Sequence, residues 1–137
     1  MVAEKFQAMV ALGIANTRMK DFYDVWLLSE THRFDGVTLA SAIAATFARR
    51  GTPLPVDTPL ALTEQFAHDP AKQAQWRAFI ERGRLLGAPA DLGLVVQRIE
   101  SLVLPAARAA NDTEPLRASW TPGEDWALGR TDSGDEV

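Results

Sequence analysis

Apolar residues recur along most of this chain at intervals of three and four, the spacing of a helix with one buried face. The strongest pattern lies between Leu92 and Val103. Four weaker patterns predict further helices, over residues 2–14, 17–31, the segment between Asp35 and Gly51, and 70–83. No segment shows the alternation typical of a strand. The sequence therefore predicts an all-α fold, a compact bundle of about five helices with an irregular C-terminal tail.

Polar residues mark the expected starts of these helices. Asp35 and Asp69 are expected N-caps, because a carboxylate accepts hydrogen bonds from the free N–H groups of a first turn. Pro70 follows Asp69 as the first helical residue, where its missing N–H does no harm. Asn16 or Thr17 is expected to cap the helix over residues 17–31.

Glycine and proline mark the expected ends. Gly51 is expected to stop the third helix, and three prolines make residues 51–59 a loop. A short helix is expected over residues 60–68. Pro105 is expected to kink or end the last helix, and irregular structure is expected beyond Asn111.

Length and charge suggest two unequal parts. A chain of 137 residues suits one domain with a real core. Residues 109–137 carry seven acidic side chains against two arginines, a net charge of −5, whereas residues 1–108 carry +1. We therefore expect a helical domain over residues 1–110 and an acidic, partly irregular tail over residues 111–137.

Composition excludes several classes of protein. The absence of cysteine excludes disulfides, thiolate chemistry and cysteine zinc sites. No apolar run approaches the roughly 20 residues of a membrane span, and the start lacks the layout of a signal peptide. The expectation is a cytoplasmic protein with no membrane partner.

Charged residues concentrate at the start of the second predicted helix. Asp21 and Asp24 lie three positions apart and so share a helix face. Arg18 lies one turn before Asp21, and Lys20 lies one turn before Asp24. An apolar stripe is expected to point elsewhere, formed by Met19, Tyr23, Trp26 and Leu27. Such a helix packs on one side and presents charged groups on the other.

Each charged group also has an ordinary structural explanation. Arg–Asp and Lys–Asp pairs at these spacings are commonly surface pairs worth about 0.3–0.5 kcal/mol. Arg49 and Arg50, near the end of the third predicted helix, could bind phosphate or RNA. They could equally offset the negative end of the helix dipole. Spacing alone leaves these alternatives open.

The charged segment resembles a known family. Glu4-Lys5-Phe6-Gln7-Ala8 and the stretch from Asn16 to Asp24 look like the third and fourth motifs of the abortive-infection nucleotidyltransferase toxins (AbiEii/AbiGii-like, type IV toxin–antitoxin). Weaker blocks follow in the family's order: Ala42-Ile43, Thr46-Phe47, Arg49-Arg50, Thr52-Pro53, Phe66, Gln75-Trp76-Arg77-Ala78-Phe79, Trp120-Thr121-Pro122-Gly123 and Trp126. The resemblance covers most of the chain.

The resemblance implies roles for the charged residues. Lys5 would contact nucleotide phosphates, and Asp21, with Asp24 as the nearby alternative, would be the aspartate of the catalytic site. Arg18 and Lys20 would contact phosphate or RNA. An intact family member implies Mg²⁺ and a nucleoside triphosphate as cofactors, although no metal ligand is identified in this chain. Lys5 and Asp21 are therefore expected to meet at one cleft.

Family members also carry a Gly-Ser element and an aspartate pair that hold the metal and nucleotide, and this chain has no such spaced set. It resembles the C-terminal portion of such a protein and is expected to be inactive alone. The expected partners are a separate N-terminal nucleotidyltransferase half or an antitoxin, with RNA as acceptor. Self-association through uncovered apolar surface is a further expectation. The alternative function is a non-catalytic module that binds one of those protein partners.

Overall fold

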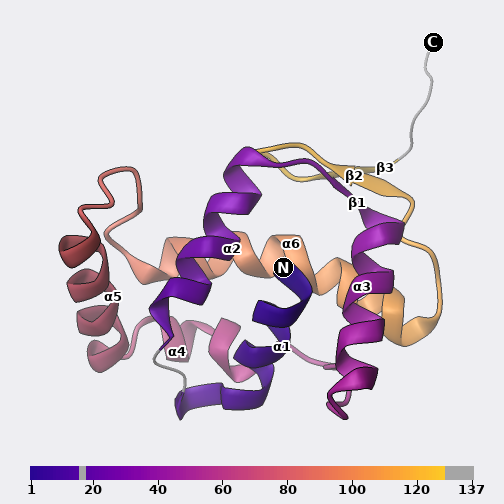
Figure 1. Ribbon diagram of the computed structural model, residues 1–137, viewed down its shortest axis with the longest axis horizontal. Helices are drawn as coiled ribbons and strands as arrows, with labels where there is room; N and C mark the ends of the chain where they lie inside the picture. The colour runs from indigo at the N-terminus through magenta and orange to yellow at the C-terminus, as the bar shows by residue number, and fades with distance from the viewer. Residues whose placement is uncertain (16–17, 129–137) are drawn as a thin grey trace.

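The computed structural model describes residues 1–15 and 18–128, and this part of the chain is mostly helical, which confirms the expected fold class (Figure 1). Its α-helices are α1 (Val2–Leu12), α2 (Met19–Thr31), α3 (Gly36–Arg49), α4 (Glu64–Ala67), α5 (Pro70–Gly83) and α6 (Leu92–Asp112). Its strands are β1 (Phe34–Asp35), β2 (Ala118–Trp120) and β3 (Trp126–Leu128). The expected caps Asn16 and Thr17 and the tail from residue 129 lie outside the described residues.

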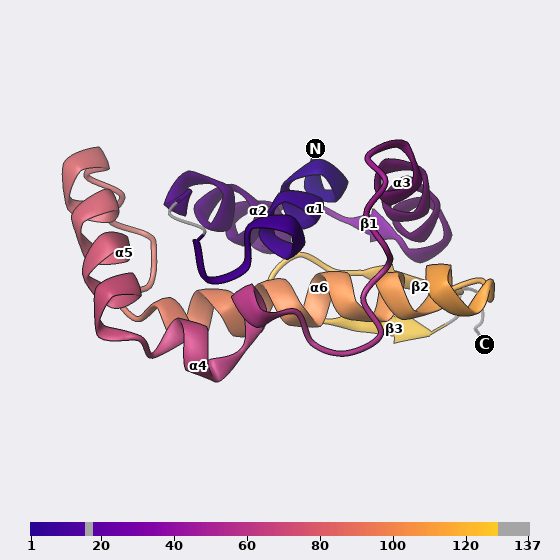
Figure 2. The ribbon, with the colours of Figure 1, turned by 90° about the horizontal axis from the view of Figure 1, so that it is seen from below.

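Helix α6 is the central element. It runs along the length of the molecule, and α1, α2 and α3 lie across one side of it (Figures 1 and 2). This is the segment with the strongest apolar pattern, and Leu92, Val95, Ile99 and Leu102 are fully buried. Burial of this face supplies the main apolar core on which the other helices are arranged. Within the described residues, no helix is both long and apolar enough to cross a membrane.

The predicted N-caps Asp35 and Asp69 are confirmed, whereas the N-cap position of α2 is Arg18. The Asp35 carboxylate accepts a hydrogen bond from the Thr38 backbone N–H at 3.0 Å, and α3 begins at the next residue. The Asp69 carboxylate accepts from the N–H groups of Ala71 and Lys72 at 2.8 and 3.1 Å, at the start of α5. Both carboxylates satisfy donors that a helix leaves unpaired. These two boundaries are therefore set locally.

Two boundary predictions were less accurate. Pro105 does not end α6, which continues to Asp112. The residues on both sides of the proline, Leu104 and Ala106, are buried, so packing offsets the backbone hydrogen bond that proline removes. The helix expected over residues 60–68 is divided into a short 3₁₀ turn at Leu60–Leu62 and the single turn of α4.

Helix α5 stands at one end of the molecule, beyond the N-terminal end of α2 (Figures 1 and 2). Trp76 fastens it, because its side chain is fully buried and its ring N–H donates to the Pro89 carbonyl at 2.8 Å. Trp76 thus faces inward as predicted. Phe79 and Ile80, also expected inward, are only half-buried against the core.

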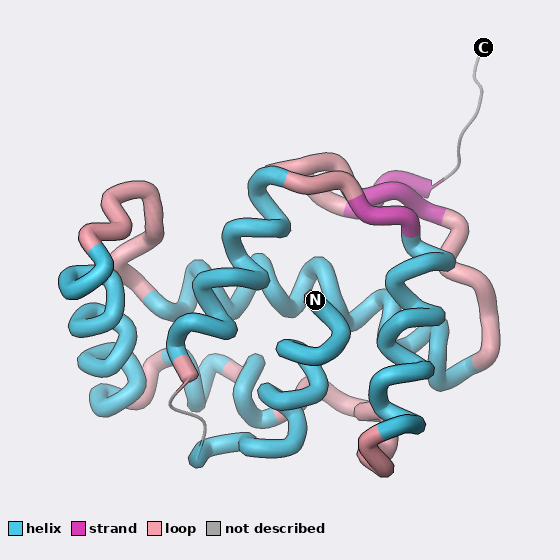
Figure 3. The backbone as a smooth tube through the Cα atoms, viewed as in Figure 1, coloured by secondary structure: helices cyan, strands magenta, loops and turns pink. Residues whose placement is uncertain are grey.

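A small antiparallel sheet joins the C-terminal end of α2 to the start of α3 (Figure 3). Phe34 of β1 pairs with Trp120 of β2, which in turn pairs with Trp126 of β3. The segment beyond Asn111 was expected to be irregular, so these strands are an addition to the predicted fold. Two- and three-residue strands are too short to leave an alternating pattern. Trp120 is fully buried, and the ring N–H groups of Trp120 and Trp126 donate to the carbonyls of Ser29 in α2 and Leu102 in α6, so the two tryptophans hold this segment on the helices as expected.

Candidate functional site

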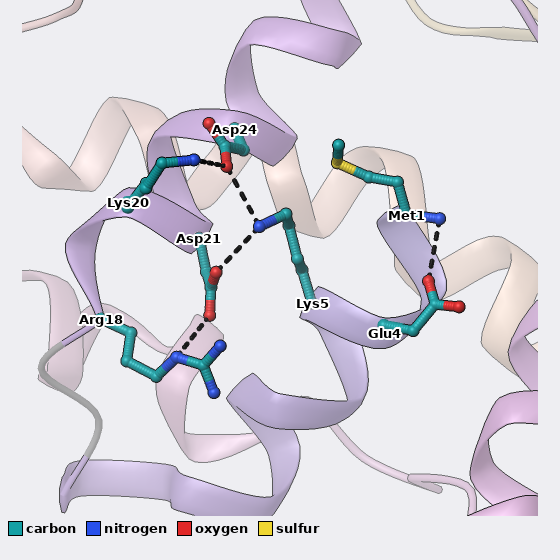
Figure 4. Close-up of polar contacts among 7 residues, drawn as sticks. All are labelled: Met1, Glu4, Lys5, Arg18, Lys20, Asp21 and Asp24. Carbon is teal, nitrogen blue, oxygen red and sulfur yellow. Dashed lines mark hydrogen bonds and ion pairs between the residues drawn. The ribbon is translucent and has the colours of Figure 1, made fainter.

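The candidate site lies where α1 passes beside the N-terminal half of α2 (Figure 4). Lys5 projects from α1, and its Nζ lies 3.0 Å from Asp21 Oδ1 and 3.0 Å from Asp24 Oδ2. One ammonium thus bridges two carboxylates that share a face of α2. The side chains are mostly withdrawn from solvent, with 20% of Lys5, 5% of Asp21 and 17% of Asp24 exposed.

Two further cations complete the cluster from the solvent side. Arg18 Nε lies 3.0 Å from Asp21 Oδ2, and Lys20 Nζ lies 2.8 Å from Asp24 Oδ2. Asp21 therefore contacts Lys5 through Oδ1 and Arg18 through Oδ2, whereas Asp24 contacts both Lys5 and Lys20 through Oδ2 (Figure 4). Three cations face two carboxylates, so the cluster keeps a net charge of +1 and can still attract an anion.

The pKa values of Lys5 and Asp24 reflect this pairing. Burial opposes the charge of Lys5, but its hydrogen bonds to Asp21 and Asp24 outweigh burial and raise the pKa of the ammonium above 10.5. Burial also opposes the charge of Asp24, yet hydrogen bonds from Lys20 and Lys5 lower the pKa of its carboxyl below 3.8. Both groups are therefore charged throughout the neutral pH range.

Packing of α2 on the core gives the carboxylates their direction. Met19, Phe22 and Val25 are buried, and the Phe22 ring stacks on Phe66 with centroids 5.5 Å apart. This buried face fixes the rotation of α2, so that Asp21 and Asp24 point toward α1. Asp21 also lies in the first turn of α2, where a negative charge is favourable.

The predicted apolar stripe of α2 was partly wrong. Met19 is buried, but Tyr23 and Trp26 are only half-buried and Leu27 is 37% exposed. Tyr23 instead packs toward α5, with its ring centroid 6.0 Å from that of Phe79. The reason is that α2 contacts both α5 and α6 and so has apolar residues on two faces, which a single stripe does not describe.

Two surface hollows flank the charged cluster. One, of about 410 Å³, lies on the α1–α3 side and is lined by Met1, Glu4, Lys5, Ala8, Arg18 and Arg50. The other, of about 500 Å³, lies between α2 and α5 and is lined in part by Arg18, Lys20, Asp21, Gln75, Phe79 and Arg82. Arg18 borders both hollows, and basic groups predominate among the charged side chains of each. The cluster is therefore open to ligands from two sides.

The two arginines at the end of α3 differ in their surroundings. Arg50 lines the hollow on the α1–α3 side, where its Nη1 donates a hydrogen bond to Gln7 Oε1 at 3.0 Å. Arg49 is 62% exposed, and its nearest acidic contact is Glu4 at 4.0 Å. Both arginines are exposed, and of the two it is Arg50 that lines this hollow together with Lys5.

Gln7 is the residue of this site that sequence reasoning missed. It is 6% exposed on α1, and its side chain contacts both Arg50 and Thr52. The signal was its position two residues after Lys5, within the segment that resembles the family's motif. A glutamine in an amphipathic helix is commonly a surface residue, so the pattern alone gave no reason to choose it.

The charged cluster does not fit a metal ion. Across residues 1–15 and 18–128, no group of three or more histidine, aspartate or glutamate side chains could hold one. The two carboxylates of the cluster already contact three cations, and a divalent ion beside those cations would be repelled. The Mg²⁺ implied by the resemblance therefore has no site among these residues.

Comparison with known proteins agrees with the resemblance. The family model described as nucleotidyl transferase AbiEii toxin, type IV TA system, matches residues 1–109, which include the whole charged cluster and both flanking hollows. Neither curated proteins nor solved structures give a match. A match over most of the chain establishes the family. This chain belongs to the AbiEii nucleotidyltransferase toxins of type IV toxin–antitoxin systems.

Proposed function

We propose that this helical domain forms one wall of a nucleotidyl-transfer site, in which Lys5 contacts the phosphates of a nucleoside triphosphate. The observation that carries the proposal is the position of Lys5, which bridges Asp21 and Asp24 beside two basic hollows. Membership of the family implies a nucleoside triphosphate and a metal for intact members, and an antitoxin as partner. The residue roles proposed here go beyond that membership.

The chemistry assigns Lys5 a specific role. In nucleotidyl transfer a hydroxyl of the acceptor attacks the α-phosphate, and the bond to the departing pyrophosphate breaks. Negative charge grows on the departing oxygens, and a fixed ammonium stabilises it. The raised pKa of Lys5 keeps it cationic at neutral pH. Its two carboxylate contacts hold it in one orientation, so little rearrangement is needed during the reaction.

Asp21 and Asp24 would then differ in importance. Asp21 is the more buried of the two and contacts both Lys5 and Arg18. We therefore propose that Asp21 orients these two cations next to the reacting groups. Asp24 contacts Lys5 and the exposed Lys20, and supports the same ammonium from the other side. Because these carboxylates are neutralised, we propose that the metal ligands come from outside this helical domain.

The hollow between α2 and α5 suits the acceptor. Arg18, Lys20 and Arg82 supply positive charge, and the half-buried ring of Phe79 supplies a face on which a base can stack. A phosphate backbone with exposed bases matches this combination, and RNA is the acceptor implied by analogy with the family. The acceptor hydroxyl would then approach from the side opposite to the α1–α3 hollow.

Labelling of RNA tests the proposal. The 137-residue chain would be combined with the N-terminal nucleotidyltransferase half encoded nearby or taken from a family member, and supplied with labelled nucleoside triphosphates, Mg²⁺ and RNA. We expect Lys5→Ala to lower the rate about 100-fold or more, because it removes a charge-stabilising group, and Asp21→Asn to lower it to a similar extent, because it releases Lys5 and Arg18. We expect Asp24→Asn to have a smaller effect.

Arg108→Ala is the matched control, because Arg108 is an exposed cation elsewhere, on α6. Unchanged labelling by Lys5→Ala would contradict the proposal. The 137-residue chain alone is expected to label no RNA, and strong labelling by it would contradict the assignment of the metal ligands to another part of the protein.

A second candidate function is a non-catalytic module that binds an antitoxin or a separate catalytic half. One observation favours it: Leu86, at the turn after α5, is 96% exposed beside a hollow of about 480 Å³ formed with Ile80, Leu85 and Ala88. Exposed apolar surface of this kind often marks a protein contact. If a Leu86→Ser variant lost binding to the antitoxin while Lys5→Ala retained transfer, the module would be favoured.

A further inference from the structure

Gln7 connects α1 to the turn that follows α3. Its Oε1 accepts a hydrogen bond from Arg50 Nη1 at 3.0 Å, and its Nε2 donates to Thr52 Oγ1 at 2.9 Å. The amide of a 6%-exposed side chain therefore has a partner at each end. A buried amide that satisfies both its donor and its acceptor holds one orientation, because any other would leave a polar group unpaired.

The backbone places these partners within reach of each other. Helix α3 ends at Arg49, and Gly51 has a φ of +64°, which turns the chain sharply after Arg50. The Thr52 N–H then donates to the Phe47 carbonyl at 2.9 Å and closes the turn. On the neighbouring position of α1, the ring of Phe6 packs on that of Phe47 with centroids 5.4 Å apart. The aromatic contact fixes Gln7 against the turn.

These contacts orient the side chain of Arg50 at the edge of a basic hollow. Lys5, Arg18 and Arg50 come from α1, the start of α2 and the end of α3, and all three line the hollow of about 410 Å³. Glu4, the acidic residue among its lining side chains, is 2.8 Å from the N-terminal ammonium of Met1. Positive charge is therefore in excess on its walls.

The ordinary explanation of Arg50 does not account for this geometry. A basic residue at a helix C-terminus can offset the helix dipole from the surface. Arg49 fits that description, being 62% exposed with only a distant acidic contact. The Arg50 side chain is also exposed, but it donates to a residue 43 positions earlier in the chain, on another helix. Its guanidinium is thereby held in place while its other N–H groups remain available for a ligand.

We propose that Gln7 is a positioning residue that fixes Arg50 as the wall of an anion subsite for the polyphosphate part of a nucleotide. The planar guanidinium presents paired N–H groups that match two phosphate oxygens, and Lys5 adds a compact charge beside it. The assignment of the anion to a nucleotide rests on the proposed function. The subsite itself rests on the hollow, its three cations and the buried amide.

Binding of inorganic tripolyphosphate to the 137-residue chain tests this subsite, measured by calorimetry at low salt. We expect Arg50→Ala to weaken binding about tenfold or more, because it removes charge-assisted hydrogen bonds. Gln7→Leu keeps a similar volume and all the charges, and is expected to weaken binding about threefold to tenfold by releasing Arg50. Arg49→Ala, the matched control, is expected to change affinity less than about twofold.

The double variant separates positioning from general damage to the fold. If Gln7 acts through Arg50, then Gln7→Leu has no further effect on affinity once Arg50 is alanine. Should Gln7→Leu fail to fold, Thr52→Val removes the other partner of the amide and is expected to weaken binding in the same direction.

Three results would overturn the proposal: no tripolyphosphate binding by the unchanged chain, unchanged affinity in Arg50→Ala, or an equal effect of Gln7→Leu with and without Arg50. The assay contains no nucleotide, metal or RNA and measures no transfer. Its failure would therefore leave the proposed roles of Lys5 and Asp21 standing. Conversely, if Lys5→Ala retained full transfer, a positive calorimetric result would still establish the subsite.

Discussion

Helix α2 is held mainly by ion pairs at its N-terminal end and mainly by hydrogen bonds and aromatic packing at its C-terminal end. At its N-terminal end, Asp21 and Asp24 are held by cations. At its C-terminal end, the Ser29 carbonyl accepts hydrogen bonds from the Trp120 ring N–H at 2.8 Å and from the Gly123 backbone N–H at 2.9 Å. The C-terminal end also has an ion pair, between Glu30 and Arg98 at 3.3 Å, and the Arg98 guanidinium lies over the Trp120 ring. Because the fully buried indole of Trp120 covers this end, we call it the aromatic end, whereas the charged end, around Asp21 and Asp24, adjoins two open hollows.

The difference indicates which end serves the fold and which is available for binding. Neutral hydrogen bonds under a large aromatic ring stabilise a fold with little desolvation penalty. Ion pairs withdrawn from water contribute less than their number suggests, because desolvation offsets much of the attraction. A cluster of five charged groups therefore contributes little net stability to the packing of a helix. It is an efficient way to keep cations fixed and charged next to a hollow.

The largest expected effect is on the aromatic end. Trp120→Ala should lower the free energy of unfolding by about 3–5 kcal/mol, because it empties a buried aromatic site and leaves the Ser29 carbonyl with one partner fewer. Urea unfolding of the 137-residue chain measures this. Leu128→Ala, at an 84%-exposed position of the same sheet, is the control and should change stability by about 0.5 kcal/mol or less. Equal losses of stability in Trp120→Ala and Leu128→Ala would contradict the role of Trp120 in holding this end of α2.

The charged end should show a pH dependence that arises from Lys5 and Asp24. Because the pKa of Lys5 is raised, its stabilising contribution is complete below pH 10.5 and is lost as pH rises through the higher folded value. Because the pKa of Asp24 is lowered, its contribution is complete above pH 3.8 and is lost as pH falls through the lower folded value.

Unfolding free energies of the unchanged chain and of Lys5→Met, measured across pH, test these signs. The difference between the two is expected to be constant at neutral pH and to change by on the order of 1 kcal/mol toward each extreme. In Trp120→Ala, the free energy of unfolding should be lower than in the unchanged chain by the same amount at every pH. A constant difference between Lys5→Met and the unchanged chain across the whole range would refute the role of these ion pairs.

The smallest effect is expected at the exposed edge of the cluster. Lys20 is 73% exposed, and its i,i+4 pair with Asp24 should contribute only about 0.3–0.5 kcal/mol at low salt. Lys20→Ala should therefore lower stability slightly, and the loss should vanish at about 0.5 M salt as screening weakens the pair. Thermal unfolding at two salt concentrations measures it. A larger loss of stability that persists at high salt would show that Lys20 contributes to holding α2 in place.

The sequence predicted those features that depend on neighbours in the chain. Asp35 and Asp69 were identified as caps because a cap and its partners lie within three residues of each other. The juxtaposition of Lys5 and Asp21, 16 residues apart, came from the family resemblance. Spacing alone could not supply it, because it depends on how α1 crosses α2.

Features that depend on tertiary packing were missed. The contact between Gln7 and Arg50 spans 43 residues and requires α1 to lie against the end of α3. The pairing of Phe34 with Trp120 joins distant segments through strands too short to form a pattern. The continuation of α6 through Pro105 depends on burial of the surrounding residues, which local propensity does not describe.

Arg18 is a wall shared by both hollows, and this gives it a consequence beyond its contact with Asp21. One guanidinium cannot direct all its N–H groups toward ligands in two different hollows at once. If both hollows bind anions as proposed, occupancy of one would change the affinity of the other, and this influence would be equal in both directions. The two hollows would then be coupled through a single side chain.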